Sequence, residues 1–197
     1  MKYEIKVLSL KKRQDRRDHM VSNFGKRYSF EFWDAIDGKT YTFTPEENNL
    51  FKNSEIHLYN CHVNSVKAVS ISNYNMWKYS ADNNINLVII EDDVWVTSAS
   101  WFDFNEIFKD DFDIHFLTDI REFANCFAYM VTPQGAQKLI NHFNKFGFKD
   151  HLDNDIRYLP KPHFKVRYEL THHFGTLHNS ILGSDILLEG HTEHIKS

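Results

Sequence analysis

The chain has 197 residues, of which 42% are hydrophobic, 15% aromatic and 25% charged, a balance typical of a folded domain rather than a disordered tail. Its formal net charge of -4 gives no molecule-wide basic field, so bulk nucleic-acid binding through phosphate neutralisation is not expected. Two distant cysteines, Cys61 and Cys126, argue against a disulfide scaffold and favour a reducing, cytoplasmic location. No apolar run near the start is long enough for a signal sequence or a membrane span, and no linker or repeat divides residues 1–197, so we expect one domain.

Patterns typical of strands and helices alternate in the first half of the chain. In order, they predict a strand over residues 3–10, a helix over 14–23, a strand over 30–35 closed by a turn at Asp37-Gly38, a helix over 65–84 and a strand over 87–90. The last strand, Leu87 to Ile90, is a continuous run of apolar residues, as expected for a strand covered on both faces.

The second half continues the alternation. Strands are predicted over residues 113–118 and 126–131, followed by a helix that Thr132 caps, that has Pro133 at its first position and that ends at Gly147. From Lys149 onward the periodicity weakens, and irregular, site-forming structure is expected there. Together these elements predict an α/β fold with a parallel or mixed sheet flanked by helices.

Three acids, Glu91, Asp92 and Asp93, follow the apolar strand directly. Like charges at this spacing repel one another, and a divalent cation would relieve the repulsion. The ends of strands are also where open α/β sheets bind ligands. If the chain stays extended, Glu91 and Asp93 point to one side, where they could hold Mg²⁺ or Mn²⁺ carrying a diphosphate. The alternative is a solvated acidic turn.

Two further features carry candidate chemistry. The first strand leads into a basic segment, residues 11–17, in which Arg13 and Arg17 are one helical turn apart. The two arginines could bind a phosphate together, and the alternative is that they form part of a solvated basic surface. Asn73 interrupts the otherwise mainly apolar stripe of the helix over 65–84, which is typical of a polar group hydrogen-bonded in the core and also compatible with a ligand contact.

A set of blocks in fixed order gives the sequence a family resemblance. They are residues 7–10 with the arginines after them, residues 33–38, residues 71–77, residues 87–94, and residues 128–131 with the helix that follows. Over roughly residues 3–155 the chain resembles glycosyltransferase family 25, which includes lipooligosaccharide biosynthesis galactosyltransferases and procollagen galactosyltransferase domains. The resemblance implies a GT-A type fold, a nucleotide-sugar donor, inverting transfer and Mn²⁺ or Mg²⁺ bound at residues 91–93.

The resemblance also implies roles for individual residues. Asp93 is the first candidate for the metal, with Glu91 and His178 as further ligands. The donor-binding residues expected are Ser9, Leu10, Arg13, Arg17, Asp37, Gly38, Asn73, Glu91 and Asp92. Where the family usually has Ser-His, this chain has Ser72-Asn73, and an asparagine carries no proton at neutral pH.

The general base is expected in the segment 151–155. The base must reach the acceptor hydroxyl without sitting on the metal, which makes residues 91–93 poor choices. Asp153 matches the family's aspartate best, and Asp155 is the second choice because alternate residues of an extended segment face the same side. The alternative is that this acidic loop is solvated or caps a following turn.

The expected function is therefore a metal-dependent inverting glycosyltransferase that moves a hexose, galactose or glucose, from a UDP-sugar to a hydroxyl group of a glycan or protein. Two alternatives remain open at this point: a catalytically inactive module that binds nucleotide sugars, and a metal-dependent phosphodiesterase. The phosphodiesterase alternative has a point against it: the sequence lacks the basic segments with interleaved aromatic residues that binding of single-stranded nucleic acid would require.

Overall fold

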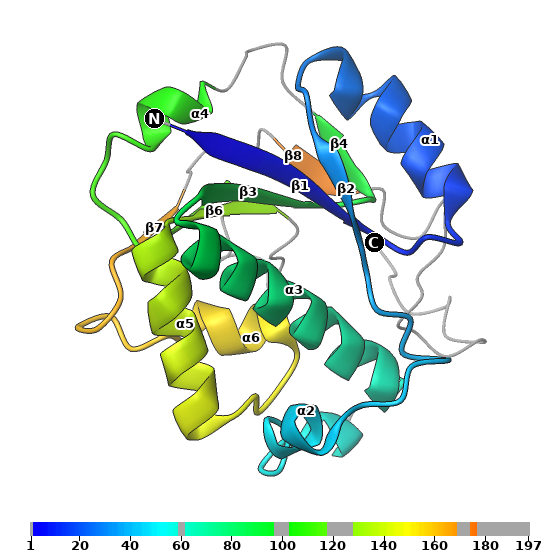
Figure 1. Ribbon diagram of the computed structural model, residues 1–197, viewed down its shortest axis with the longest axis vertical. Coiled ribbons are helices and arrows are strands. Elements are labelled where there is room, and N and C mark those ends of the chain that lie inside the picture. The colour runs from blue at the N-terminus through cyan, green and yellow to red at the C-terminus, as the bar shows by residue number, and fades with distance from the viewer. Residues whose placement is uncertain (1, 59–61, 97–102, 118–127, 169–173, 177–197) are drawn as a thin grey trace, which may run out of the picture.

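The computed structural model describes residues 2–58, 62–96, 103–117, 128–168 and 174–176 (Figure 1). Its central sheet has six strands in the order β2-β1-β3-β6-β5-β7. The strands are β1 (Tyr3–Ser9), β2 (Glu31–Asp34), β3 (Asn86–Glu91), β5 (Ile114–Phe116), β6 (Ala128–Val131) and β7 (Val166–Tyr168). The pairs β1–β2, β1–β3 and β5–β7 are parallel, and β6 runs antiparallel to β3 and β5, so the predicted mixed α/β sheet is confirmed.

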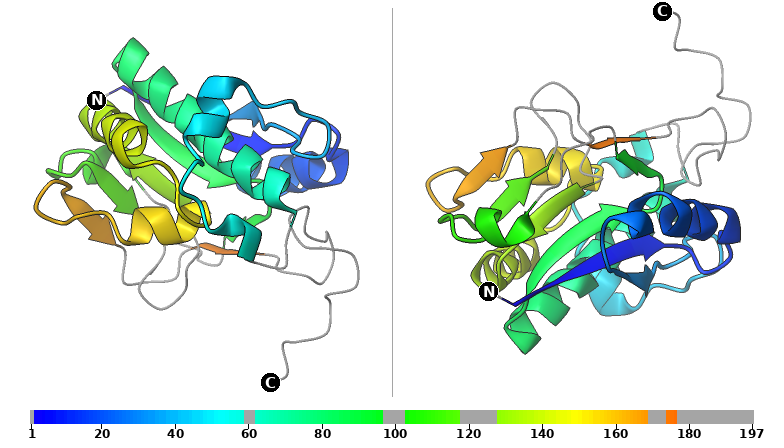
Figure 2. Two further views of the ribbon diagram at one scale, coloured as in Figure 1. Left: turned by 90° about the horizontal axis from the view of Figure 1, so that it is seen from below. Right: turned by 90° about the horizontal axis from the view of Figure 1, so that it is seen from above.

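Two hydrophobic clusters cover the two faces of this sheet. Leu87 and Ile89 of β3 belong to one cluster, together with residues of α3 (Val63–Asn83), α5 (Pro133–Phe146) and α6 (Leu152–Arg157). Val88 and Ile90 belong to the other, with α1 (Gln14–Ser22), the 3-10 helix η1 (Phe24–Lys26) and α4 (Phe104–Ile107). Strand β3 is therefore buried on both faces as predicted, and helices flank both sides of the sheet (Figures 1 and 2).

The predicted helix after Thr132 is confirmed. The Thr132 hydroxyl accepts a hydrogen bond of 3.0 Å from the backbone N–H of Gly135 at the start of α5. A Cβ on Gly135 would lie 1.9 Å from the Asp113 carbonyl oxygen, so this close approach of helix and strand requires glycine. At the other end Gly147, with φ of 76°, ends the helix in a conformation that L side chains rarely adopt.

The prediction of irregular structure after Lys149 is wrong at the described residues 152–157, 166–168 and 174–176, which form regular elements. Leu152 and Ile156 are buried four residues apart, and this spacing places both on the core side of the short helix α6. Further on, β7 adds the edge strand of the main sheet, and β8 (Phe174–Thr176) pairs antiparallel with β4 (Val94–Val96). The short helices α2 (Pro45–Asn49) and η2 (Ile56–Leu58) also form, the former with a capping box between Thr44 and Glu47.

The parallel pairing of β2, β1 and β3 determines where a ligand site can form. Their carboxyl ends, at Asp34, Ser9 and Glu91, meet at the same edge of the sheet. The turn after β2 packs against the first turn of α3, where a Cβ on Gly38 would lie 2.2 Å from the Asn64 carbonyl oxygen. Among the described residues, no helix has the length and apolar character that crossing a membrane requires.

Candidate active site

The acid turn, Glu91-Asp92-Asp93, lies between β3 and β4 at the carboxyl edge of the sheet. The strand ends at Glu91, and the next two residues form a turn instead of continuing in extended conformation. The alternation expected for Glu91 and Asp93 therefore does not apply. Asp92 is buried, with only 5% of its surface exposed, while Glu91 and Asp93 are half-buried. Three carboxyl groups held this close together with so little solvent require compensating charge.

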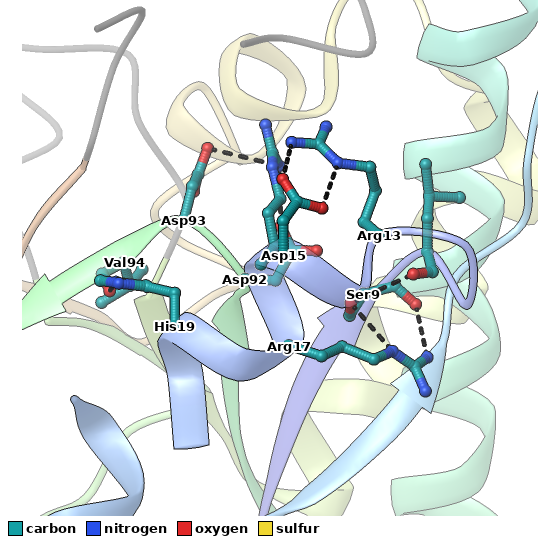
Figure 3. Close-up of polar contacts among 10 residues, drawn as sticks. Ser9, Arg13, Asp15, Arg17, His19, Asp92, Asp93 and Val94 are labelled. Carbon is teal, nitrogen blue, oxygen red and sulfur yellow. Dashed lines mark hydrogen bonds and ion pairs between the residues drawn. The ribbon is translucent and has the colours of Figure 1, made fainter. Parts of the chain in front are cut away.

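Part of that charge comes from Arg16 on α1. Its guanidinium donates a hydrogen bond of 2.7 Å to Asp92 and lies 3.7 Å from a carboxylate oxygen of Asp93. Burial raises the pKa of Asp92, and the charge of Arg16 and the hydrogen bond from the Ser9 hydroxyl oppose that rise. Figure 3 shows Ser9, Asp92 and Asp93 gathered beside α1. Helix α1 thus supplies a cation to the acid turn.

Glu91 experiences an excess of negative charge. Burial and then the charges of Asp93, Asp153 and Asp92 raise its pKa well above the usual range for a glutamate. Asp153 belongs to α6, 62 residues beyond Glu91 in the sequence and on the same side of the sheet as α3. The fold therefore brings the candidate base and the acid turn within electrostatic reach of each other.

The chemistry of the acid turn fits a hard divalent cation. Oxygen ligands suit Mg²⁺ and Mn²⁺, and the Oδ1 atom of Asp93 is buried without a hydrogen-bond partner in the described structure. No three described histidine, cysteine or acidic residues already converge as a metal cage. Magnesium is commonly held by one or two carboxylates plus substrate phosphates, so Asp93 and Glu91 are the residues that would hold the ion. His178, the further ligand expected from sequence, lies outside the described residues.

The basic segment is more strongly paired than the sequence suggested. Arg13 binds Asp15 through two hydrogen bonds of 2.8 and 2.9 Å, which lower the pKa of Asp15 to about 2 (Figure 3). Arg17 donates to the backbone and side-chain oxygens of Ser9, at 3.1 and 3.3 Å, and pairs with Asp34. Arg13 and Arg17 thus have separate partners at the end of β1. Exposed pairs of this kind contribute only about 0–1 kcal/mol, so a diphosphate could still compete for the guanidinium groups.

The turn after β2 borders a small cavity between the sheet and α3. The cavity measures about 60 Å³, and its lining residues are Leu8, Leu10, Ala35, Ile36, Asp37, Gly38, Ser65, Val69 and Ser72. The Ser72 hydroxyl accepts a hydrogen bond of 3.0 Å from the backbone of Ile36, which ties the turn to the helix. Asp37 pairs with Lys12 and accepts from the backbone of Lys39 at 3.1 Å; although burial acts against it, these contacts lower its pKa. Leu10, Asp37 and Gly38 therefore do share one pocket at the carboxyl edge.

Asn73 lies in the core of the protein. Only 2% of its surface is exposed; its Nδ2 donates to the Val69 carbonyl at 3.0 Å, and its Oδ1 accepts from the Tyr129 hydroxyl at 2.7 Å. That hydroxyl in turn accepts from the indole N–H of Trp77 at 2.9 Å. This chain of buried hydrogen bonds fits the core interpretation of Asn73, because it satisfies both the amide nitrogen and the amide oxygen of the side chain inside the protein.

Asp153 and Asp155 do not share a face, because the segment is helical rather than extended. At 100° per residue, positions two apart on a helix point about 160° away from each other. The Asp155 carboxylate accepts hydrogen bonds from the backbone of Lys149 at 3.0 Å and Asp150 at 3.2 Å, and burial raises its pKa to about 6. Asp155 thus fixes the turn that precedes α6, whereas the alternative from sequence had this segment cap a following turn. The charge of Asp153 acts on the acid turn.

Sequence reasoning singled out Arg13 and Arg17 and missed Arg16 as a partner of the acid turn. The i, i+4 spacing of Arg13 and Arg17 predicted that they share one face of the helix. The docking of α1 against β4, however, determines which arginine contacts the acids. That docking is visible in the contact of the His19 ring with the Val94 carbonyl at 3.3 Å (Figure 3). The available signal in the sequence was the position of Asp92, directly after the apolar strand at residues 87–90. A carboxylate at the end of a buried strand requires a compensating cation, which an arginine of α1 could supply.

The fold and the acid turn define an α/β domain with a ligand site at the carboxyl ends of parallel strands. The sequence model for glycosyltransferase family 25 (LPS biosynthesis protein) matches residues 3–119, more than half of the chain. The chain therefore belongs to glycosyltransferase family 25 and is a glycosyltransferase, in agreement with the family that the resemblance indicated.

Distant solved structures resemble the chain as well. One is a glycosyltransferase involved in glycosylation of the major capsid of PBCV-1, with 10% identity and a TM-score of 0.46, covering 86% of this chain and 80% of that one. Another is the glycosyltransferase GlyE of Streptococcus pneumoniae TIGR4, with 9% identity and a TM-score of 0.46, covering 86% of this chain and 45% of that one. No curated protein gives a significant match.

Proposed function

We propose that the protein transfers a hexose, galactose or glucose, from a UDP-sugar to a hydroxyl group of a glycan or protein, with inversion at the sugar carbon and with Mn²⁺ or Mg²⁺ bound at the acid turn. The observation that carries the proposal is the meeting of Ser9, the basic helix α1 and the acid turn at one edge of the sheet, within electrostatic reach of Asp153.

On the donor side, the ends of β1 and β2 border the nucleotide. We assign the small cavity beside Asp37 and Gly38, with Leu10 in its wall, as a contact point for an edge of the base or ribose. Arg13 has a carboxylate partner that a donor phosphate could displace, because the side chain of Asp15 is 48% exposed. Its guanidinium can then engage a phosphate through two donors at once.

Negative charge develops on the departing UDP during transfer. A divalent cation at Asp93 and Glu91 would neutralise that charge. The protein itself positions the acids. Arg16 donates a hydrogen bond to Asp92, and Asp92 also accepts a hydrogen bond from the Ser9 hydroxyl at the end of the neighbouring strand. The acid turn is thereby held in place before the donor binds, which reduces the reorganisation needed during the reaction.

On the acceptor side, Asp153 is the proposed general base. An inverting transfer places the acceptor hydroxyl on the face of the sugar opposite the leaving UDP, and a carboxylate there removes the hydroxyl proton as the new bond forms. Asp153 comes from α6, an element separate from the strand ends that border the donor. Its effect on Glu91 supports a place beside the donor site and outside the pair of carboxylates assigned to the metal.

The test is a UDP-sugar assay with purified full-length protein, with and without Mn²⁺. Release of UDP from UDP-galactose or UDP-glucose that depends on Mn²⁺ and increases with an acceptor supports the proposal. Binding of UDP-sugar without turnover would instead identify a non-catalytic module. The observation that favours this alternative is that the Arg16 guanidinium contacts Asp92 and Asp93 and so already neutralises part of the charge that a metal would balance. Cleavage of a phosphodiester substrate alone would identify the phosphodiesterase.

A further inference from the structure

A second cavity lies away from the acid turn, between the end of α5 and α6. It measures about 450 Å³, within the range of small-molecule sites. Asn154, Asp155 and Tyr158 of the α6 region line it, whereas Asp153 is not among the lining residues and its charge acts on Glu91. Helix α6 therefore separates this cavity from the proposed transfer site and contributes residues to both.

Aromatic rings at the cavity are unusually exposed. Tyr158 is 74% exposed and Phe146 is 46% exposed, and they are two of the four large hydrophobic side chains found exposed among the described residues. The His142 ring packs against Phe146 with 4.9 Å between ring centroids. Exposed aromatic side chains gathered at one concave site are typical of a binding surface, because folding alone gives no reason to leave them in water.

Polar groups of the cavity are held in fixed positions. The Asp155 carboxylate is fixed by backbone N–H groups of Lys149 and Asp150, and the Asp150 carboxylate accepts from the side chain of Asn154 at 2.9 Å. The loop that carries them is itself anchored, since the Glu55 backbone N–H donates to the Lys149 carbonyl at 2.7 Å. The cavity is thus preorganised, which lowers the entropic cost of binding a ligand.

The charge of the lining selects the kind of ligand. Glu55, Asp150 and Asp155 give the lining three carboxyl groups, and Lys149 gives it one ammonium. Lys145 and Arg157 lie over one face of the Phe146 and Tyr158 rings, at 4.9 and 5.6 Å from the ring centroids. The site therefore has no excess of positive charge that would select phosphate or another anion. Carboxylates accept hydrogen bonds from hydroxyl groups, and aromatic rings pack against the apolar C–H faces of a sugar ring. Hydroxyl-rich molecules with apolar faces satisfy both sets of groups.

We propose that this cavity is a binding site for an uncharged saccharide, remote from the transfer site, which holds a distal part of a glycan acceptor. Its identity as an acceptor site rests on the proposed function, whereas saccharide binding itself does not. The ligand stacks on Tyr158 and Phe146 and donates hydroxyl hydrogen bonds to the carboxylates around Asp155. A glycan reaching around α6 would then present another part of its chain to Asp153.

Saturation-transfer difference NMR with lactose, maltotriose and chitotriose tests the site in the full-length protein. We expect transfer from aromatic protons to at least one of these saccharides in the wild type, and a loss of about tenfold or more in the double variant Tyr158→Ala/Phe146→Ala. Neither side chain is buried, with Tyr158 74% and Phe146 46% exposed, so the variant should melt close to the wild-type temperature. Tyr41→Ala, which removes an exposed aromatic side chain elsewhere, is the matched control and should keep the signal.

The outcomes separate this proposal from the proposed function. Absence of transfer to all three saccharides in the wild type, or an unchanged signal in the double variant, overturns the saccharide site. Saccharide binding that depends on Tyr158 and Phe146 in a protein that neither binds nor turns over UDP-sugar supports the site and overturns the transferase proposal instead. In an active enzyme, the double variant should raise KM for an oligosaccharide acceptor and leave kcat and UDP affinity unchanged.

Discussion

Arg16 and Asp92, 76 residues apart in the sequence, form a hydrogen-bonded ion pair of 2.7 Å in which the side chains are only 12% and 7% exposed. The pair connects α1 to the acid turn and so links the first βα unit to the end of the central strand. Removing one member of a buried pair costs more than the pair contributes, because the remaining charge stays buried without compensation.

Arg16→Ala should therefore lower the free energy of unfolding by about 3–5 kcal/mol. Arg13→Ala is the matched control on the same segment: its partner Asp15 is half exposed, and the expected change is about 0–1 kcal/mol. Urea unfolding followed by circular dichroism measures both. The double variant Arg16→Ala/Asp92→Asn should recover part of the loss, and equal effects of the two arginine substitutions would contradict the inward role of Arg16.

Asn73→Ala should destabilise the protein without affecting the donor. It removes the acceptor of the Tyr129 hydroxyl in the buried chain to Trp77, at a cost of about 1–3 kcal/mol. Asn83→Ala, on the exposed last turn of the same helix, should change stability by less than about 0.5 kcal/mol. Thermal melting and UDP titration are the measurements. A tenfold weaker UDP affinity at unchanged stability would show that Asn73 contacts the donor after all.

Local patterns were sufficient to predict five of the six strands of the central sheet and its main helices. The run from Leu87 to Ile90 identified the buried strand, and Thr132 with Gly147 delimited α5. The acids at the strand end could be placed at the edge of the sheet because parallel strands end together there. These features depend on neighbours in sequence, which is why sequence reasoning located them.

Features set by distant contacts could not be predicted in the same way. Helix α6 has only two buried positions in six residues, Leu152 and Ile156, too few for a recognisable period, so Asp153 and Asp155 were wrongly placed on one face. Strand β7 lies at the edge of the sheet, and none of its residues is fully buried. The choice of Arg16 over its neighbours depends on how α1 packs against β4, which no local pattern encodes.

Stability should depend on pH through Asp155. Burial raises the pKa of this carboxyl from 3.8 to about 6 in the folded protein, so the folded state holds the proton more tightly than the unfolded chain. Its contribution is then fully present below pH 3.8 and is lost as the pH rises through about 6. Asp155→Asn should remove this slope, so that the variant gains up to about 3 kcal/mol relative to wild type between pH 3.5 and pH 7. Urea unfolding at both pH values measures it, and a constant difference between the two proteins would contradict the assignment.

Asp93→Asn should make UDP binding independent of Mn²⁺. The amide keeps the shape of the side chain but removes the charge that holds a cation, so UDP affinity in Mn²⁺ should fall at least about tenfold, while affinity in EDTA stays near the wild-type value. Asp110→Asn removes an exposed carboxylate elsewhere and should leave both affinities unchanged. Isothermal titration calorimetry gives these values, and metal-dependent binding retained in Asp93→Asn would exclude Asp93 as a ligand.

Asp153→Asn should lower turnover by roughly two to four orders of magnitude, the usual contribution of general base catalysis, and leave donor affinity nearly unchanged. The structure separates it from Asp155, which is occupied by two backbone N–H groups before α6, whereas the charge of Asp153 acts on Glu91. Asp155→Asn keeps an oxygen acceptor for those groups and should retain near-normal turnover. Single-turnover transfer assays with both variants decide the matter: an active Asp153→Asn beside an inactive Asp155→Asn identifies Asp155 as the base, and two active variants exclude α6 from proton transfer.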